Sequence, residues 1–169
     1  MDDARLQQLW APWRLEYITA APPPKVGDGC FLCAGVCGAD DRGNLVALRT
    51  LWSVVVLNKY PYNNGHLLIA PKAHKGELHE LTAKELLDTQ EALRRMVGHL
   101  DALLKPDGYN VGLNLGRVAG AGLPGHLHWH VVPRWHGDTN FMPVLSGAKV
   151  IVQSLEALYD LLVERLAKE

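Results

Sequence analysis

The chain has 169 residues, which is enough for one domain of ordinary size and too few for two. Seventeen Lys and Arg residues balance eighteen Asp and Glu residues, which argues against a surface built to grip a DNA or RNA backbone but leaves small anionic ligands open. Apolar residues make up 48% of the chain, so it can bury a real core, and eight histidines stand out in this composition.

The N-terminal residues 1–29 have the pattern of an arm that precedes one domain at residues 30–169. The first residues are polar and carry charges of both signs, unlike a secretory signal, and no apolar run in the chain is long enough to cross a bilayer. A stiff proline stretch at 22–24 ends any helix that begins in this arm. We therefore expect a cytoplasmic protein without a membrane or a nucleic-acid polymer as its partner.

Three cysteines follow the arm, and two of them, Cys30 and Cys33, have the CxxC spacing of half a zinc site. In a chain without an export signal, this odd count favours a metal site or reduced thiols over a disulfide framework. Cys37 is expected to be a small buried residue or a spare thiol.

Hydrophobic periodicity and turn residues predict the remaining elements. Strands are expected at residues 44–49, 51–57, 66–70, 109–115 and 126–133. A long helix is expected at 82–104, because Thr82 and Glu85 form a capping box, and a terminal amphipathic helix is expected at 154–168. The stripe of the long helix expected to face the core consists of Leu86, Leu93, Val97, Leu100 and Leu104. Short strands around one central helix predict an α+β fold with an antiparallel sheet, a long central helix and a C-terminal helix.

Three histidines at every second position, His126, His128 and His130, mark the predicted strand 126–133 as a candidate site. A strand sends alternate side chains to opposite faces, so the imidazoles are expected on one face and the apolar residues between them in the core. Two chemistries can use this face. An HxH pair can bind a metal with an open position for water, or a neutral imidazole held at Nδ1 can present Nε2 as a nucleophile. Two other histidines, His79 and His99, are expected at the surface of the long helix.

Read as H-φ-H-φ-H-φ-φ, residues 126–132 resemble the signature of the histidine triad (HIT) superfamily of nucleotide hydrolases and transferases. Residues 63–72 and 112–116 are similar to two further strands of that family. The longer stretches 57–66 and 132–142 resemble a bacterial branch that includes diadenosine tetraphosphate phosphorylases.

The resemblance implies a role for each histidine of the signature. His128 would attack the α-phosphorus of a nucleotide and form a covalent nucleotidyl-histidine, with its Nδ1 held by a main-chain oxygen. His130 and His66 would contact the α-phosphate oxygens, and His126 would support the site. Asn114 corresponds to a position that polarises the phosphate region. The implied substrate-binding residues are Asn58, at the ribose hydroxyls, together with Asn63, Gly120, Gly122 and Gly125.

The sequence departs from the commonest family pattern just before the triad. Many HIT hydrolases have Gly-Gln-Ser or Gly-Gln-Thr there, whereas residues 119–125 of this chain offer no side-chain donor. Backbone N–H groups of the glycine-rich loop are expected to cradle phosphate instead. This departure argues against a simple nucleoside phosphoramidase and favours a polyphosphate substrate.

The resemblance also completes a zinc site. Zinc-bearing members combine the CxxC pair with the histidine of a P-K-x-H segment and the first triad histidine. In this chain those residues are Cys30, Cys33, His74 and His126. Such a closed Cys2His2 site would be structural, and it would leave His128 and His130 for the reaction.

The function implied is nucleotidyl transfer or hydrolysis at the α-phosphate of nucleotides. Phosphorolysis of diadenosine tetraphosphate to ADP and ATP is expected, with inorganic phosphate as the second substrate. The alternatives are hydrolysis of dinucleoside polyphosphates or nucleoside phosphoramidates, and nucleotide binding without catalysis. The family resemblance further implies a homodimer or a larger homo-oligomer.

Overall fold

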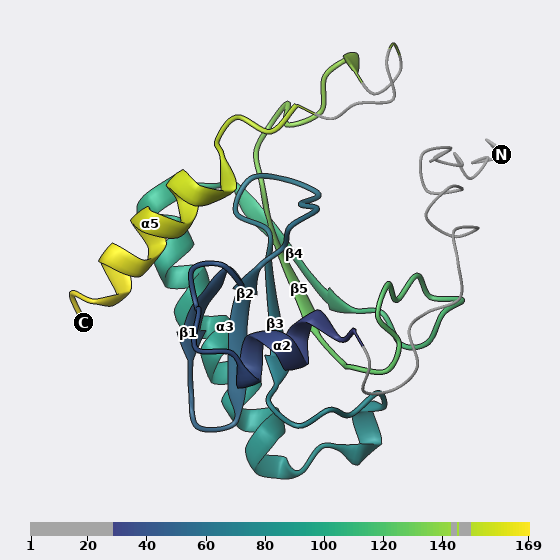
Figure 1. Cartoon of the computed structure of the whole chain (residues 1–169). Coiled ribbons are helices and arrows are strands. Elements are labelled where there is room, and N and C mark those ends of the chain that lie inside the picture. The colour runs from purple at the N-terminus through teal and green to yellow at the C-terminus, as the bar shows by residue number, and fades with distance from the viewer. Residues whose placement is uncertain (1–28, 143–144, 146–149) are drawn as a thin grey trace, which may run out of the picture.

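The computed structural model describes residues 29–142, 145 and 150–169, and it arranges five strands of these residues in one antiparallel sheet (Figure 1). The strand order across the sheet is β1-β2-β3-β5-β4, so the last two strands of the sequence exchange places. The strands are β1 (Val46–Arg49), β2 (Ser53–Leu57), β3 (Leu67–Pro71), β4 (Gly108–Leu113) and β5 (Trp129–Arg134). The α+β class, the antiparallel sheet and the two predicted helices are therefore confirmed.

Helices lie on both faces of the sheet (Figure 1). The long helix α3 (Ala83–Leu104) and the terminal helix α5 (Leu155–Leu166) pack on one face, where the core includes Ile69 and Trp129. The short helix α2 (Phe31–Cys37) lies on the other face, against Val54, Val56 and Leu68. No helix in the described part of the chain is long and apolar enough to cross a membrane.

The helix α3 begins as predicted, because Thr82 caps it and exchanges hydrogen bonds with Glu85. The predicted buried stripe is partly wrong. The buried face runs through Ala92, Met96 and Leu100, whereas Leu86 is 41% exposed. The physical reason is that the small Ala92 and the adaptable Met96 let α3 approach the sheet closely. The larger residues Leu93, Val97 and Leu104 pack at the edge of the core.

Two other features of the fold differ from the sequence-based expectations, and a third decides between two alternatives. The CxxC segment forms the helix α2, with Cys30 as its N-cap, and this helix was not among the predicted elements. His99 was expected at the surface but is only 5% exposed, because the chain after α5 folds back over it. Cys37 is an exposed free thiol, which agrees with the spare-thiol alternative and excludes the buried one. The predicted arm lies almost wholly outside the described residues, and the division at residues 29 and 30 stays a prediction.

The strand that carries the triad is also shorter at its start than predicted. β5 begins at Trp129, where its pairing with Ile69 of β3 begins. The two preceding histidines instead belong to a segment held by other backbone bonds, from Leu127 N to Lys75 O (2.7 Å) and from His126 N to Leu123 O (3.3 Å). The triad therefore spans the junction between a loop and a strand.

Candidate active site

The triad histidines lie on the face of the sheet opposite the main core. Leu127, Trp129 and Val131 pack in the core with α3 and α5, as the alternation predicted. His126 is fully buried, and its ring contacts Cys30 at the start of α2. His128 is 8% exposed. The ring centroids of His128 and His130 are 5.0 Å apart, so the two imidazoles form one polar surface.

The backbone fixes the protonation of His128. Its Nδ1 lies 2.8 Å from the carbonyl oxygen of His126. A carbonyl only accepts hydrogen bonds, so Nδ1 carries the proton and Nε2 keeps a lone pair. Burial lowers the pKa of His128 below its ordinary value, which outweighs the opposite effect of this hydrogen bond. The ring is therefore neutral at physiological pH and has a nucleophilic nitrogen.

A chain of hydrogen bonds sets the tautomers of the two neighbouring histidines. The backbone N–H of Tyr62 donates to Nδ1 of His66 (3.0 Å), so His66 has its proton on Nε2. That nitrogen lies 2.9 Å from Nδ1 of His130 and donates to it. His130 then has its proton on Nε2 and presents a donor on the triad surface. The Asn114 amide nitrogen lies 3.4 Å from this Nε2, and because both groups are donors in this tautomer, the pair is a contact and not a hydrogen bond.

His66 is held in the neutral form throughout the physiological range. Burial, followed by the neighbouring His130 and His128, lowers the pKa of His66 to about 3. Both ring nitrogens of His66 are engaged within the protein, and the residue is 1% exposed. The predicted contact of His66 with phosphate would need one of these bonds to open, and it stays a prediction.

Tyr62 belongs to this site, although the sequence analysis did not select it. Its ring is stacked on His130, with ring centroids 5.7 Å apart and an interplanar angle of 16°. Tyr62 directly precedes the turn that ends at Gly65, whose φ of +78° and close approach to Leu104 and Pro133 exclude a side chain there. An aromatic residue just before this turn was the available signal.

The asparagines predicted to bind substrate lie in two different places. Asn58 is next to the histidines, with its amide nitrogen 3.2 Å from Nδ1 of His66 and its oxygen accepting from Tyr60 N. Asn63 is buried, and its amide donates to Pro133 O (3.0 Å) and to Asp138 Oδ2 (2.8 Å). Asn63 therefore ties the turn to the end of β5.

The glycine-rich loop 117–125 crosses near Asn114 and then passes the cysteine pair. The Asn114 amide is 3.4 Å from Gly120 O, while Gly120 N donates to Arg117 O (2.9 Å). The N–H of Gly120 is thus used within the loop. A Cβ placed on Gly125 would lie 3.5 Å from His74 Nε2, so Gly125 is beside the cysteine–histidine cluster. The phosphate contacts predicted for these glycines and for Gly122 stay predictions.

The four predicted metal ligands come together, with their ligand atoms all within 4.8 Å of one another. Cys33 Sγ is 3.1 Å from His74 Nδ1, and His126 Nδ1 is 3.3 Å from Cys30 Sγ and 3.5 Å from Cys33 Sγ. Tetrahedral zinc with ordinary bond lengths separates its ligands by roughly 3.3 to 3.8 Å. The spacing of the cluster fits a zinc ion.

The protonation of this cluster fits a metal as well. His126 Nε2 donates to Pro71 O (2.8 Å), so its Nδ1 lone pair points toward the sulfurs. Burial, followed by the hydrogen bond and the charge of Cys30, raises the pKa of Cys33 to about 11. Two cysteine sulfurs and two imidazole nitrogens gathered in this way are the donor set of a structural zinc site.

Known proteins are similar to this chain in sequence and in fold. The HIT domain model matches residues 45–137, more than half of the chain. An AP-4-A phosphorylase of Mycobacterium tuberculosis is 38% identical over 98% of this chain and 87% of its own length. The chain belongs to the HIT family. A second HIT relative, an adenosine 5'-monophosphoramidase of Schizosaccharomyces pombe, is 30% identical over 62% of this chain and 74% of its own length.

A solved HIT structure covers most of the chain. It is described as a zinc-bound histidine triad family protein from Mycobacterium smegmatis. It has a TM-score of 0.65 and 25% identity, and the match covers 83% of this chain and 94% of that one. The resemblance inferred from residues 126–132 is thereby confirmed at the level of the family and of the fold.

An ion pair connects the helical layer of this HIT domain to its cysteine–histidine cluster. Lys75 Nζ lies 2.7 Å from Glu85 Oε2, and Glu85 also accepts from Thr82 N at the start of α3. Lys75 follows His74, and its carbonyl oxygen accepts a hydrogen bond from the N–H of Leu127. This lysine therefore anchors to α3 both the segment that contains His74 and the segment that contains the triad. Lys75 and then Thr82 lower the pKa of Glu85 to about 2.

Replacing Glu85 by glutamine is therefore expected to destabilise the protein by about 2 kcal/mol at pH 7. The pKa of Glu85 is depressed from 4.5, so its contribution is complete above that pH and is lost as the pH falls toward 2. Urea unfolding of both proteins between pH 7 and pH 2 checks this. Glu91→Gln, on the exposed side of α3, should change the free energy of unfolding far less, and an equal loss in both variants would contradict the prediction.

Proposed function

We propose that this chain is a nucleotidyl transferase that cleaves diadenosine tetraphosphate with inorganic phosphate and releases ADP and ATP. The observation that carries the proposal is the bond between His128 Nδ1 and the His126 carbonyl, which leaves Nε2 as a nucleophile. The similarity to an AP-4-A phosphorylase over nearly the whole chain supports the choice of substrate and of phosphate as acceptor.

The proposed reaction has two displacements at one phosphorus atom. The His128 Nε2 lone pair attacks the α-phosphorus, the bond from that phosphorus to the bridging oxygen breaks, and ATP leaves. An oxygen of inorganic phosphate then attacks the adenylyl group, the P–N bond breaks, and ADP is released with His128 neutral again. His130 donates from Nε2 to an α-phosphate oxygen in both steps, because the relay from Tyr62 through His66 sets its tautomer.

In this proposal His66 is a positioning residue that acts through His130. Asn114, next to His130 Nε2, helps orient the phosphate. Asn58, which contacts His66, is also proposed to contact the ribose of the substrate. The main-chain N–H groups of Gly122 and Gly125 are proposed to contact the phosphate chain. Asn63 and Gly120 would contribute by holding the turn and the loop in place.

We further propose that Cys30, Cys33, His74 and His126 hold a structural zinc ion, which ties α2 and the loop after β3 to the triad. The zinc-bound HIT protein of similar fold supports this metal. A closed site of four protein ligands supplies rigidity and leaves the nucleophile to His128. The cytoplasmic location and the homo-oligomeric state stay predictions.

Product analysis tests the reaction. Diadenosine tetraphosphate is incubated with the purified protein, with and without inorganic phosphate, and the nucleotides are separated by anion exchange. We expect ADP and ATP only when phosphate is present. Formation of AMP and ATP in the absence of phosphate would indicate hydrolysis. If neither incubation gave a product, the remaining alternative would be a protein that binds nucleotides without catalysis. Cleavage of adenosine phosphoramidate, the activity named for the Schizosaccharomyces pombe relative, is the second activity to measure.

A further inference from the structure

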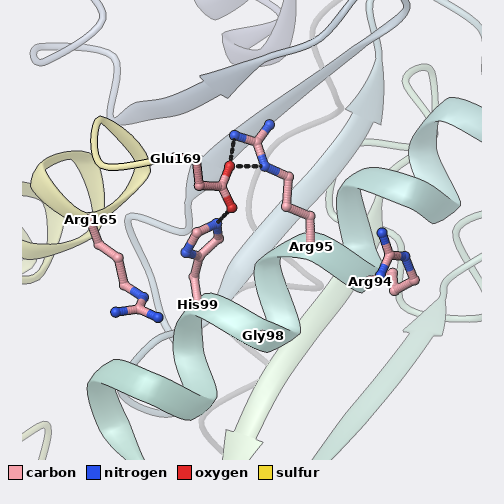
Figure 2. A pocket seen from close by; sticks show the side chains of 6 residues that line it. All are labelled: Arg94, Arg95, Gly98, His99, Arg165 and Glu169. Atoms are coloured by element: carbon pink, nitrogen blue, oxygen red, sulfur yellow. Dashed lines mark hydrogen bonds and ion pairs between the residues drawn. The ribbon is translucent and has the colours of Figure 1, made fainter.

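A hollow of about 270 Å³ lies between α3 and the end of α5 (Figure 2). These two helices cover the face of the sheet opposite the triad. The hollow has no part in the proposed reaction. Its walls are rich in cationic and hydrogen-bonding groups. The lining residues are Arg94, Arg95, Gly98, His99, Arg165 and Glu169.

A carboxylate of the chain already occupies part of this hollow. Arg95 donates to Oε2 of Glu169 through Nε (2.6 Å) and through Nη2, and His99 Nε2 lies 2.7 Å from Oε1 (Figure 2). These bonds lower the pKa of Glu169, chiefly through Arg95. The walls therefore bind an anionic group. Glu169 is 44% exposed and follows the end of α5, so its side chain is held there by Arg95 and His99 but is open to solvent.

The carboxylate leaves two groups of the hollow unsatisfied. His99 is 5% exposed, and its Nδ1 has no hydrogen-bond partner among the described residues. Buried polar atoms in native proteins nearly always have a partner, so this nitrogen indicates a missing one. The Arg165 guanidinium extends on the other side of the His99 ring and makes no hydrogen bond or ion pair with the described residues (Figure 2).

The charges around the hollow favour a further anion. Arg94 is paired with Glu91 at its edge, and Arg95 is paired with Glu169. Arg165 is then the uncompensated cation, and a second one appears when Glu169 moves away. Guanidinium groups match the oxygen geometry of phosphate.

We propose that this hollow is an anion site that binds a phosphoryl group in place of the Glu169 carboxylate. A phosphoryl group offers three terminal oxygens where the carboxylate offers two, so it can take over the contacts with Arg95 and His99 and present a further oxygen toward the side of the hollow that Arg165 lines. Free phosphate and the terminal phosphate of a nucleotide share this chemistry. The site is independent of the proposed reaction, because it lies across the sheet from His128.

Gly98 provides a specific reporter, because this residue of α3 lines the hollow. The full-length protein is labelled with ¹⁵N and titrated with sodium phosphate, ADP, ATP and adenosine at constant ionic strength. We expect a saturable shift of the Gly98 resonance with phosphate, at millimolar concentration, and none with adenosine or chloride. If the Gly98 shift saturates with phosphate but not with ADP, the site binds the free anion. If it saturates with both, the site also binds the terminal phosphate of a nucleotide.

Three variants distinguish a built site from general attraction. Glu169→Gln removes the internal competitor, so phosphate should bind at least about 3-fold more tightly. Arg165→Gln removes a charged donor from an exposed position and should weaken binding about 10-fold. Lys168→Gln is the matched control, because Lys168 pairs with Glu164 outside the hollow, and it should change binding less than 2-fold.

The proposal is overturned if the Gly98 resonance does not respond to phosphate. It is also overturned if Lys168→Gln weakens binding as much as Arg165→Gln does, or if Glu169→Gln leaves the affinity unchanged. None of these readouts depends on turnover, so a failed phosphorolysis assay would not affect them.

Discussion

Replacing His128 by asparagine is expected to reduce the turnover of diadenosine tetraphosphate by about 10⁴-fold or more. Asparagine can still donate to the His126 carbonyl, which His128 Nδ1 reaches at 2.8 Å, so the local backbone should be retained. The amide nitrogen of asparagine is not nucleophilic, because its lone pair is delocalised into the carbonyl group, so it cannot attack phosphorus. Steady-state rates give the effect, and mass spectrometry of quenched reactions should find the adenylyl adduct in the parent protein alone.

The matched control is His79→Asn, because His79 is an exposed histidine of the short 3-10 helix η1 (Leu78–Glu80). Its turnover should stay within about 2-fold of the parent. The nucleotide affinity of His128→Asn, measured by calorimetry, should fall only slightly, since the substitution removes bond formation more than ground-state contacts. Substantial turnover by a folded His128→Asn protein would refute its role as the nucleophile.

Cys33→Ser is expected to have the largest effect on stability. The Cys33 sulfur lies 3.1 Å from His74 Nδ1 and 3.5 Å from His126 Nδ1, so it is one of the four proposed zinc ligands. Serine is a poor zinc ligand. We expect the zinc content to fall from about one ion per chain to near zero, and the free energy of unfolding to fall by about 3 kcal/mol or more. Metal analysis and urea unfolding measure the two quantities.

Cys37→Ser is the control for this change, because Cys37 lies in the same helix α2 but is exposed. Its zinc content and its unfolding midpoint should match those of the parent. If the parent itself contains less than about half a zinc per chain, the metal site is refuted. If both cysteine variants are destabilised equally, the loss belongs to α2 and not to a metal.

Local pattern was enough to predict much of the fold and the composition of the site. The alternation of histidines with Leu127, Trp129 and Val131 correctly separated a polar face from an apolar one. The capping box at Thr82 correctly marked the start of α3. The four cysteines and histidines predicted as ligands also come together, although they are up to 96 residues apart in the sequence.

The errors arise where distant contacts decide the outcome. His99 reads as a surface residue on a helix, but Glu169, 70 positions later, folds back over it. Pairing with β3 ends at Ile69, so β5 begins only at Trp129 although the alternation extends back to His126. Tyr62 gave no periodic signal, because its role depends on stacking with a residue of another strand. Periodicity reports a local environment, and these features depend on tertiary packing.

The position of His126 has a consequence for how the protein loses activity. Its ring belongs to the cysteine–histidine cluster, and its carbonyl oxygen holds His128 in the reactive tautomer. One residue therefore belongs both to the cluster and to the hydrogen bond of the proposed nucleophile. If the proposed zinc ion steadies this backbone, a preparation with zinc in part of its chains should contain molecules of higher and of lower turnover. Its maximal rate would scale with metal content while its apparent affinity for substrate stayed constant.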